Sequence, residues 1–329
     1  MPADRQKNSI MDRSSVAVIL LNYNQWEMTA ECVESVLKSD YPDFRVMIID
    51  NGSRTEDDYD NLLKYVSEKC ELYRLVQNRG YVGGMNYGMQ LAAEGGYDFF
   101  LVMNNDAVIA PEAIRSLVEC SGRYGNRCIV TGKVYNYDRP RVIQHIGYEF
   151  TDRKNLQLKR LAEDVEDTGQ WDQEIEMDMI DDIFWLFPSS LYRLIGGYSN
   201  YFWFSAEQAD LAMRAVKAGY RLIYTPEARL WHKGSLSIGG RDKNPAHAYY
   251  DLQGSLVFRF LHLGRLRFLV FYFSIVFSIL KGSLKNAFKR VFGISNDTNM
   301  SRASFRALLW FNKWVFTRGD NNGSNPFSR

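Results

Sequence analysis

Four short apolar runs, each followed at once by polar side chains, constrain the fold of this chain more than any other feature of its sequence. They span residues 16–21, 44–50, 72–77 and 99–103, and stretches with helical spacing of apolar residues lie between them. Unbroken apolar runs that alternate with helices are typical of a mostly parallel sheet whose two faces are both covered. We therefore expect an α/β fold with a Rossmann-like central sheet and helices on both faces.

The polar residues after these runs predict one ligand site. In sheets of this kind, ligands bind at the carboxyl ends of the strands. The residues that follow the four runs include Tyr23, Asp50, Asn51, Asn78, Asn105 and Asp106. Because four strand ends turn polar together, we expect these side chains to share a single site.

A glycine-rich segment, residues 78–88, lies between the third run and the next helix. It contains Gly80, Gly83, Gly84 and Gly88. Glycine permits positive φ and close approach of a ligand to the backbone, and the helix N-terminus beyond it favours an anion. The spacing is not that of the dinucleotide fingerprint, and no Walker lysine follows. A tight turn beneath a closely packed helix is the alternative, but the number of glycines favours a loop that contacts a ligand.

Asp106 and His232 are the candidate metal ligands. Asp106 follows two asparagines at a strand end, and one carboxylate beside amides suits Mg²⁺ or Mn²⁺ that bridges to phosphate oxygens. The alternative for Asp106 is a cap on the helix predicted to begin near Pro111. His232 ends an apolar strand, where a neutral imidazole either completes a Mn²⁺ shell or packs as an ordinary core residue.

Glu207 is the candidate general base. It stands three residues before Asp210, so both carboxylates share one helix face, and Asp210 has Arg214 at i+4 as an ion-pair partner. Glu207, in the first turn, is then free to take a proton from an attacking hydroxyl.

The C-terminal part of the chain is basic and aromatic. Residues 254–329 contain 12 Lys and Arg against two Asp and Glu. The 13 uncharged residues 268–280 fall short of the roughly 20 that span a bilayer. The segment that follows puts Leu284, Phe288, Val291 and Phe292 on one helix face and Lys281, Lys285, Lys289 and Arg290 largely on the other. This pattern favours a helix that lies in the membrane interface, with docking on the protein core as the alternative.

The rest of the composition indicates a reduced, cytosolic protein. Its four cysteines form no Cys-x-x-Cys pair, and the polar lead 1–14, expected to be disordered, lacks the apolar core of a secretory signal. Residues 1–253 carry 28 basic and 37 acidic side chains, so we expect no basic groove for nucleic acid.

Several segments, in their order, resemble the family 2 glycosyltransferases with a GT-A fold, and most of all their rhamnosyltransferase-like branch in surface-polysaccharide and cell-wall synthesis. The similar segments are YNQWEMTAECVESVL, IIDNGS, QNRGYVGGMNYG, LVMNNDAVI and EQADLAMRAVKAGYRLIYTPEARLWHKGS. The resemblance covers about residues 15–240. It implies a GT-A catalytic domain at 15–245, with a nucleotide-sugar half at about 15–110 and an acceptor half at about 111–245, before a helical tail at 246–329.

The resemblance implies an inverting, divalent-metal-dependent transfer of a sugar from a nucleotide diphosphate-sugar to a hydroxyl of a lipid-linked or polysaccharide acceptor. dTDP-rhamnose is the first candidate donor and UDP-hexoses are next. We expect a peripheral location on the cytoplasmic face of the membrane. By the resemblance, the donor-binding residues are Tyr23, Asp50, Asn51, Asn78, Gly80, Gly83, Gly84, Asn86 and Asn105. Asp106 and His232 would hold Mn²⁺ or Mg²⁺, and Glu207 would be the base.

The chain departs from the family pattern at several positions. Asn104-Asn105 opens its DxD-type motif, and Gln208 replaces the second carboxylate of the Glu-Asp-x-Asp motif. Phe187-Pro188-Ser189-Ser190 stands where a Gly-Ala pair is usual, and Gln253-Gly254 replaces Arg-Asn after two tyrosines. A catalytically degenerate sugar-nucleotide-binding subunit is therefore the alternative. A nucleotidyltransferase would need a basic residue near an N-terminal glycine-rich loop, which the segment after Val16 lacks.

Overall fold

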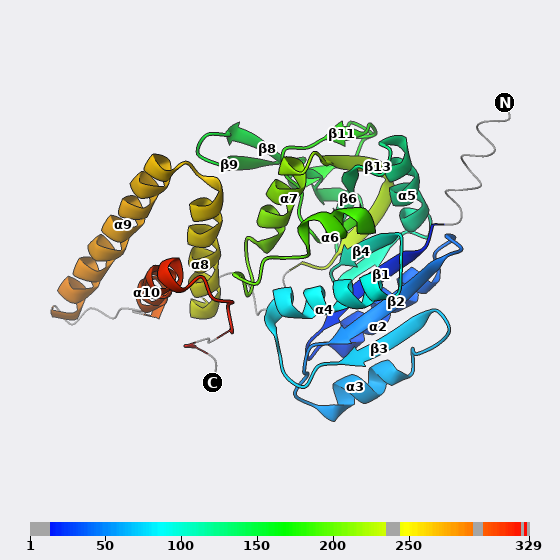
Figure 1. Ribbon diagram of the computed structural model, residues 1–329, viewed down its shortest axis with the longest axis horizontal. Coiled ribbons are helices and arrows are strands. Elements are labelled where there is room, and N and C mark those ends of the chain that lie inside the picture. The colour runs from blue at the N-terminus through cyan, green and yellow to red at the C-terminus, as the bar shows by residue number, and fades with distance from the viewer. Residues whose placement is uncertain (1–13, 235–243, 292–298, 324–325, 328–329) are drawn as a thin grey trace.

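A computed structural model describes residues 14–234, 244–291, 299–323 and 326–327. It confirms the α/β fold with a central, mostly parallel sheet and a helical C-terminal part (Figure 1). Nearly all of the predicted lead 1–14 lies outside the described residues. The strands are β1 (Val16–Asn22), β2 (Phe44–Asp50), β3 (Cys70–Arg74), β4 (Phe99–Met103), β5 (Ala107–Ile109), β6 (Cys128–Asn136), β7 (Val142–His145), β8 (Gly147–Asp152), β9 (Gln157–Leu161), β10 (Val165–Glu166), β11 (Ile175–Glu176), β12 (Phe184–Pro188) and β13 (Arg221–His232).

The helices cover both faces of the sheet, as predicted. They are α2 (Trp26–Leu37), α3 (Glu56–Leu63), α4 (Gly80–Glu94), α5 (Ala113–Arg123), α6 (Ser189–Ile195), α7 (Glu207–Lys217), α8 (Pro245–His262), α9 (Arg265–Val291) and α10 (Asn299–Thr317). Apolar residues of α2, α3 and α5 pack in one cluster with Val18 and Leu20 of β1. Those of α4, α6 and α7 pack in the other with Ala17 and Ile19. Successive residues of β1 therefore serve opposite layers, which explains its unbroken apolar run.

The strand order places the carboxyl ends of β1, β2 and β4 at one edge. The main path runs β10-β7-β6-β12-β4-β1-β2-β3, and β13 pairs with β6, β5 and β11. β1, β2, β3 and β4 are parallel neighbours. β12 is antiparallel to β4, with Phe184 opposite Met103. The beginning of β12 therefore lies at the same edge as the end of β4.

Three of the four predicted strands have the expected positions, and the third is displaced. β3 covers Cys70–Arg74 rather than 72–77. The backbone N–H of Leu75 still donates to the carbonyl of Asp50 at 2.8 Å, but Val76 is fully exposed. β3 is an edge strand with a single neighbour, and it ends at Arg74.

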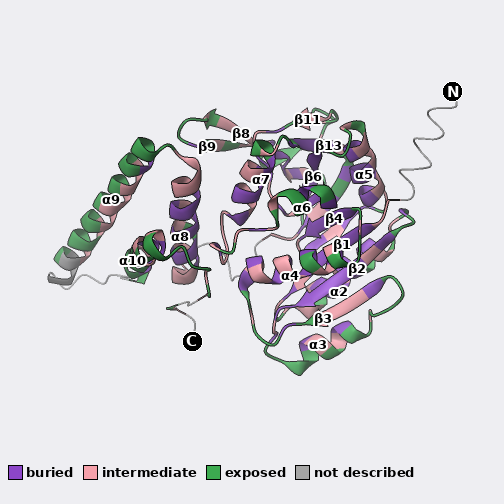
Figure 2. Ribbon diagram, in the orientation of Figure 1, coloured by how far each residue is buried: buried purple, intermediate pink, exposed green. Residues whose placement is uncertain are grey.

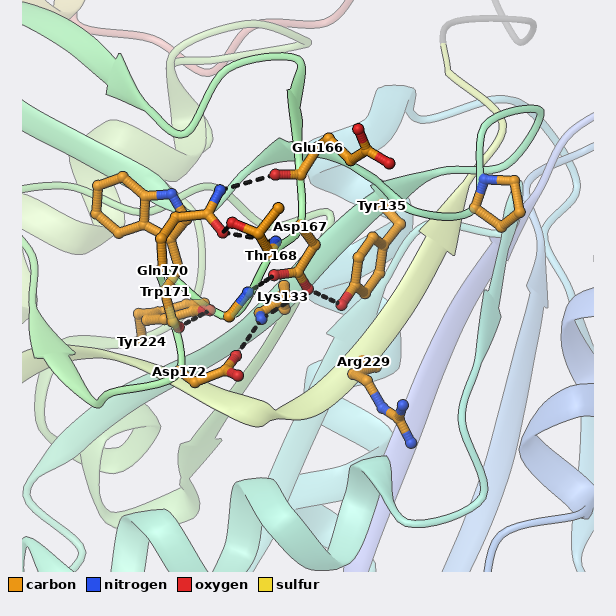
Figure 3. A network of polar contacts seen from close by, with 12 residues as sticks. Lys133, Tyr135, Glu166, Asp167, Thr168, Gln170, Trp171, Asp172, Tyr224 and Arg229 are labelled. Atoms are coloured by element: carbon orange, nitrogen blue, oxygen red, sulfur yellow. Dashed lines mark hydrogen bonds and ion pairs between the residues drawn. The ribbon is translucent and has the colours of Figure 1, made fainter.

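Residues 163–182, which are rich in Asp and Glu and precede β12, fold over the part of the sheet formed by β6 and β13. The buried ammonium of Lys133 on β6 pairs with Asp167 at 2.9 Å and with Asp172 at 2.6 Å (Figure 3). The Tyr135 hydroxyl donates to Asp167 at 2.5 Å, and that of Tyr224 donates to a backbone carbonyl in the same segment. A buried charge must be paired, so these contacts fix the segment to the sheet.

Candidate active site

Asp106 and His232 meet where β4 and β13 end. His232 is the last residue of β13 and lies opposite Ala107 of β5, so strand pairing sets it beside Asp106. Their Oδ1 and Nε2 atoms are 3.1 Å apart, and both side chains are buried. The other ring nitrogen, Nδ1, is 3.0 Å from Oε1 of Gln144. If Nδ1 carries the proton toward that amide oxygen, Nε2 presents a lone pair to the carboxylate.

This pair fits a divalent cation. Two adjacent ligands of an octahedral ion with bonds of about 2.1 Å stand roughly 3 Å apart, close to the separation of the Asp106 and His232 atoms. The Asn104 amide lies 3.4 Å from the same Nε2. Within the described ranges, no group of three or more His, Cys, Asp or Glu residues forms a complete metal site. A cation here would need further ligands from a substrate or water.

Asn105 points away from this pair, into the sheet edge. Its Nδ2 donates to Oγ1 of Thr29 at 2.8 Å, and that hydroxyl donates to Asn22 Oδ1 at 2.8 Å. Asn22 in turn donates to Asp50 at 3.0 Å. The chain of bonds ties the ends of β4, β1 and β2 together. Sequence reasoning missed Thr29, although it belongs to the segment that carries the family resemblance.

Asp50 and Tyr23 lie at the carboxyl ends of β2 and β1. Asp50 is buried and accepts from Ser53 at 2.5 Å. Among the described residues its Oδ2 has no hydrogen-bond donor, and Nε of Arg74 is 3.6 Å away. The pKa of Tyr23 is lowered, because hydrogen bonding to Asn78 and Arg54 and the charge of Arg54 outweigh the raising effect of burial. Tyr23 and Asn78, which follow different strands and were expected to share one site, therefore lie together.

Asn51 and Asn78 shape the glycine-rich segment from within. Asn51 donates to the Gly80 carbonyl at 3.0 Å and accepts from the Arg79 N–H at 3.0 Å. Asn78 Oδ1 accepts from the Gly80 N–H at 2.7 Å. Gly80 has φ +73°, a conformation that glycine adopts without strain. The asparagines thus hold the turn from which α4 begins.

The other predicted residues of this segment contact protein. A Cβ at Gly84 would lie 2.3 Å from Leu21, and one at Gly83 would lie 2.6 Å from Cβ of Arg79. Gly84 therefore allows close packing of α4 on the sheet, the alternative considered above. Asn86 donates to the Tyr198 carbonyl at 2.9 Å and accepts from its N–H at 2.9 Å, which fixes the loop before α7. Donor contact by these three residues stays a prediction.

Glu207 opens α7 in a buried, acidic cluster. Only 3% of its surface is exposed, and no described residue donates a hydrogen bond to its Oε2. Burial and the carboxylates of Asp182 and Asp251 raise its pKa well above the ordinary value. Asp182 accepts from the Tyr81 hydroxyl at 2.8 Å and from that of Tyr198. Burial raises the pKa of Asp182 to about 6, although both tyrosines oppose the rise.

Asp182 links the acidic cluster to the pair formed by Asp106 and His232. It precedes Ile183, whose carbonyl accepts from the Asn104 N–H at 2.9 Å. Asn104 stands two residues before Asp106, so Glu207 and Asp106 belong to the same edge of the sheet. Sequence reasoning missed Asp182, because this residue precedes an apolar run instead of following one. Its place directly before the apolar run that forms β12 was the available signal.

Asp210 is held by contacts within the protein, and these include the predicted ion pair with Arg214. It is buried and pairs with Arg214 at 2.8 Å. It also accepts from Ser199 at 2.6 Å, and His262 of α8 lies 2.8 Å away. Gln208 keeps its side-chain oxygen buried without a donor among the described residues.

Comparison with known proteins places this edge in context. Residues 17–173 match the family model described as Glycosyl transferase family 2. The poly-β-1,6-N-acetyl-D-glucosamine synthase of Staphylococcus epidermidis is 23% identical over 233 residues, covering 68% of this chain and 51% of that protein. The hyaluronan synthase of Streptococcus pyogenes is 30% identical over 108 residues, covering 32% of this chain and 26% of that protein. The chain thus spans about half the length, or less, of these curated relatives.

A solved structure supports the fold. GalNAc-T7 with UDP, GalNAc and Mn²⁺ superposes with a TM-score of 0.55 at 14% identity, over 72% of this chain and 47% of that one. At this low sequence identity, the match shows similarity of fold alone. Taken together, the two comparisons show that residues 17–173 of this chain are similar to Glycosyl transferase family 2 and that the fold is similar to that of this solved structure.

Proposed function

We propose that this protein is an inverting glycosyltransferase that moves a sugar from a nucleotide diphosphate-sugar to an acceptor hydroxyl. The observation that carries the proposal is the pairing of Asp106 with His232 at 3.1 Å on the sheet edge that also holds the buried carboxyl of Glu207. The family match supports the reaction class. The nucleoside would bind beside Tyr23 and Asp50, with Asn51 and Asn78 holding the turn at the start of α4.

A divalent cation held by Asp106 and His232 would supply positive charge beside the departing diphosphate. Glu207 would take the proton from the acceptor hydroxyl, whose oxygen bonds to the anomeric carbon as the bond to the diphosphate breaks. Because the acceptor approaches opposite the leaving group, the anomeric configuration inverts. A raised pKa makes Glu207 a stronger base once it is ionised. General-base catalysis is most efficient when the pKa of the base lies near the working pH.

The donor sugar is proposed from the resemblance to the rhamnosyltransferase-like branch. dTDP-rhamnose is our first candidate, and UDP-hexoses are the second. A screen of sugar nucleotides for thermal stabilisation in the presence of Mn²⁺ tests this, because a ligand that binds only the native state raises the melting temperature. Stabilisation by UDP-sugars but not by dTDP-rhamnose would exclude the first candidate.

We further propose that the C-terminal helices attach the enzyme to the cytoplasmic face of a membrane, near a lipid-linked or polysaccharide acceptor. α9 is exposed along most of its length (Figure 2), and many of its exposed side chains are apolar. The exposed apolar side chains of α9 are Leu266, Leu269, Val270, Phe273, Phe277, Leu280, Leu284 and Phe288. The exposure of Leu284 and Phe288 supports the predicted apolar face, while Phe292 falls outside the described residues.

α9 is longer than its 13-residue uncharged run, because the helix continues past Lys281. Arg265–Asn286, 22 residues with mean hydropathy 1.6, is long and apolar enough to cross a membrane by length and composition. Attachment at the surface is favoured by its contacts with α10. Phe268 packs on Phe311 near one end of α9, and Asn286 bonds Ser301 at 2.7 Å toward the other.

α10 therefore runs antiparallel to α9. It also carries charged side chains, which would have to be buried if α9 and α10 crossed the membrane as a pair. A cavity of about 430 Å³ between the two helices is lined by Arg302 and Arg306 together with Ser283, Asn286 and Ser301. These donors suit the phosphate of an anionic lipid headgroup.

The alternative is a sugar-nucleotide-binding subunit without catalysis. It is favoured by Gln208, which supplies an amide where the family pattern has a carboxylate and leaves its oxygen without a described donor. Nucleoside diphosphate release by the purified chain with Mn²⁺ or Mg²⁺ and an acceptor distinguishes the two functions. Tight nucleotide binding without turnover of any donor would favour the binding subunit.

A further inference from the structure

The turn that delivers Glu207 to its position has an unusual backbone. Ser205 and Ala206, the two residues before Glu207, both have positive φ, at 72° and 71°. Successive non-glycine residues rarely adopt this left-handed conformation, because the Cβ atom crowds the backbone. Such strain persists only where the surrounding structure imposes it, and it is concentrated at functional sites. We call residues 203–206 the α7 turn.

Helix α8 imposes this conformation from one side. A Cβ placed on Gly254 would stand 2.2 Å from the backbone oxygen of Ser205, so only glycine lets the turn approach the helix this closely. One helical turn earlier, Asp251 accepts a hydrogen bond from the Ser205 hydroxyl. Helix α8 therefore contacts both the backbone and the side chain of the first left-handed residue.

Residues 318–323, which follow α10, hold the turn from another side. The ring of Trp203 lies between two glycines: a Cβ on Gly80 would be 2.5 Å from it, and one on Gly323 would be 2.2 Å from it. The Asn321 N–H donates to the Asn200 carbonyl at 2.7 Å, just before the turn. Trp203 thus joins the start of α4 to the C-terminal segment.

We propose that Asp251, Gly254 and Gly323 are positioning residues for Glu207, so that the C-terminal helices form part of the catalytic centre as well as the proposed membrane contact. This inference rests on the proposed function, since Glu207 is the proposed base. It goes further by making the tail necessary for catalysis even with a water-soluble acceptor.

The contacts that join α8 to the body do not explain these three residues. His262 of α8 lies 2.8 Å from Asp210, and Lys217 lies 3.0 Å from the same imidazole. These contacts attach α8 to α7 without requiring left-handed residues at 205 and 206. The acidic groups that face Glu207 come from other elements as well, namely Asp182 before β12 and Asp251 on α8.

The test is Gly254→Ala in the full chain, with Gly282→Ala as the matched control, since a Cβ at Gly282 meets nothing within 4 Å. Hydrogen exchange by mass spectrometry reports on amides 199–210, and calorimetry with UDP and dTDP reports on nucleotide affinity. Release of nucleoside diphosphate from dTDP-rhamnose, UDP-glucose and UDP-N-acetylglucosamine gives kcat and KM.

We expect Gly254→Ala to accelerate exchange of amides 199–210 at least tenfold and to lower kcat at least tenfold. Nucleotide affinity and donor KM should change less than twofold, and Gly282→Ala should leave every value unchanged. Asp251→Ala should lower kcat, and Asp251→Glu, which keeps the hydrogen-bond acceptor, should recover part of the loss. A simple folding defect would instead lower nucleotide affinity and the melting temperature together.

Unchanged exchange and kcat in both Gly254→Ala and Asp251→Ala would overturn the inference. Failure of the proposed function would look different. If Glu207→Gln kept full transfer while Gly254→Ala lost both protection and kcat, the turn would still be positioned by α8, but for a different catalytic group. If no donor were turned over, the exchange measurement would still decide whether α8 imposes the turn.

Discussion

Oδ1 of Asp106 and Nε2 of His232 stand 3.1 Å apart, although the two residues are 126 positions apart in the sequence. Both side chains are buried, and an uncompensated buried carboxylate is unfavourable. A divalent cation shared by the two groups and by a nucleotide diphosphate would relieve this cost. The pair is therefore the structural basis of the proposed metal dependence.

Replacing Asp106 by Asn should uncouple nucleotide binding from the metal. We expect Mn²⁺ to raise the affinity of the wild-type protein for UDP or dTDP. In the variant this increase should be at least tenfold smaller, because the anionic metal ligand is gone. Isothermal calorimetry with and without Mn²⁺ measures the two affinities. Asp40→Asn is the control, since Asp40 is exposed, precedes β2 at the opposite end of the strand and pairs with Arg115. Equal enhancement in both variants would refute the metal assignment.

Glu207→Gln should make the protein more stable at neutral pH. The folded state raises the pKa of this carboxyl, so its contribution to stability is full below about pH 4.5 and is lost as the pH rises toward the folded pKa. The amide avoids this loss. Chemical unfolding at pH 5 and pH 8 should show a gain in the free energy of unfolding for the variant, and this gain should be larger at pH 8. A gain that does not depend on pH would contradict the raised pKa.

Asp182→Asn should show a similar effect within a defined window. The pKa rises from 3.8 to about 6 on folding, so wild-type stability should fall by on the order of 3 kcal/mol across that range relative to the variant. Both tyrosine hydroxyls donate to the same carboxylate oxygen, and an amide oxygen there can accept both bonds. Unfolding free energies measured between pH 4 and 7 test this, with exposed Asp60→Asn as the control. Parallel curves for wild type and Asp182→Asn would exclude the shift.

Introducing serine at Phe273 and Phe277 should weaken membrane attachment. Both side chains are more than 60% exposed on α9, and each would bury apolar area in the lipid interface. Flotation with vesicles containing anionic phospholipid should show at least a tenfold loss of bound protein, while Leu63→Ser on α3 should have no effect. If the protein with serine at both positions floats as well as the wild type, the exposed apolar side chains of α9 bind a partner other than the membrane.

The sequence predicts those parts of the site that depend on one strand and its end. The bounds of β2 and β4 follow from their apolar runs, and Asp106 and His232 are each visible as a polar residue after such a run. Asp182 could not be found in this way, because it precedes its strand and reaches the edge only through the antiparallel pairing of β12 with β4.

The glycines show a second limit of sequence reasoning. Gly84 and Gly88 suggest a ligand loop, but a Cβ at either position would collide with Leu21 or Ile19 of β1. Gly254 looks like an ordinary helix residue, yet it permits the close approach of the α7 turn. Such requirements arise from contacts between distant segments, which local spacing does not reveal.

The rate of sugar transfer by Glu207→Gln, with donor affinity measured on the same protein, tests the central claim most directly. General-base catalysis contributes about 10²–10⁴-fold, so we predict that transfer falls at least 100-fold while the donor and Mn²⁺ bind as tightly as in the wild type. Transfer at the wild-type rate would show that no proton passes to Glu207 and would contradict the proposed mechanism.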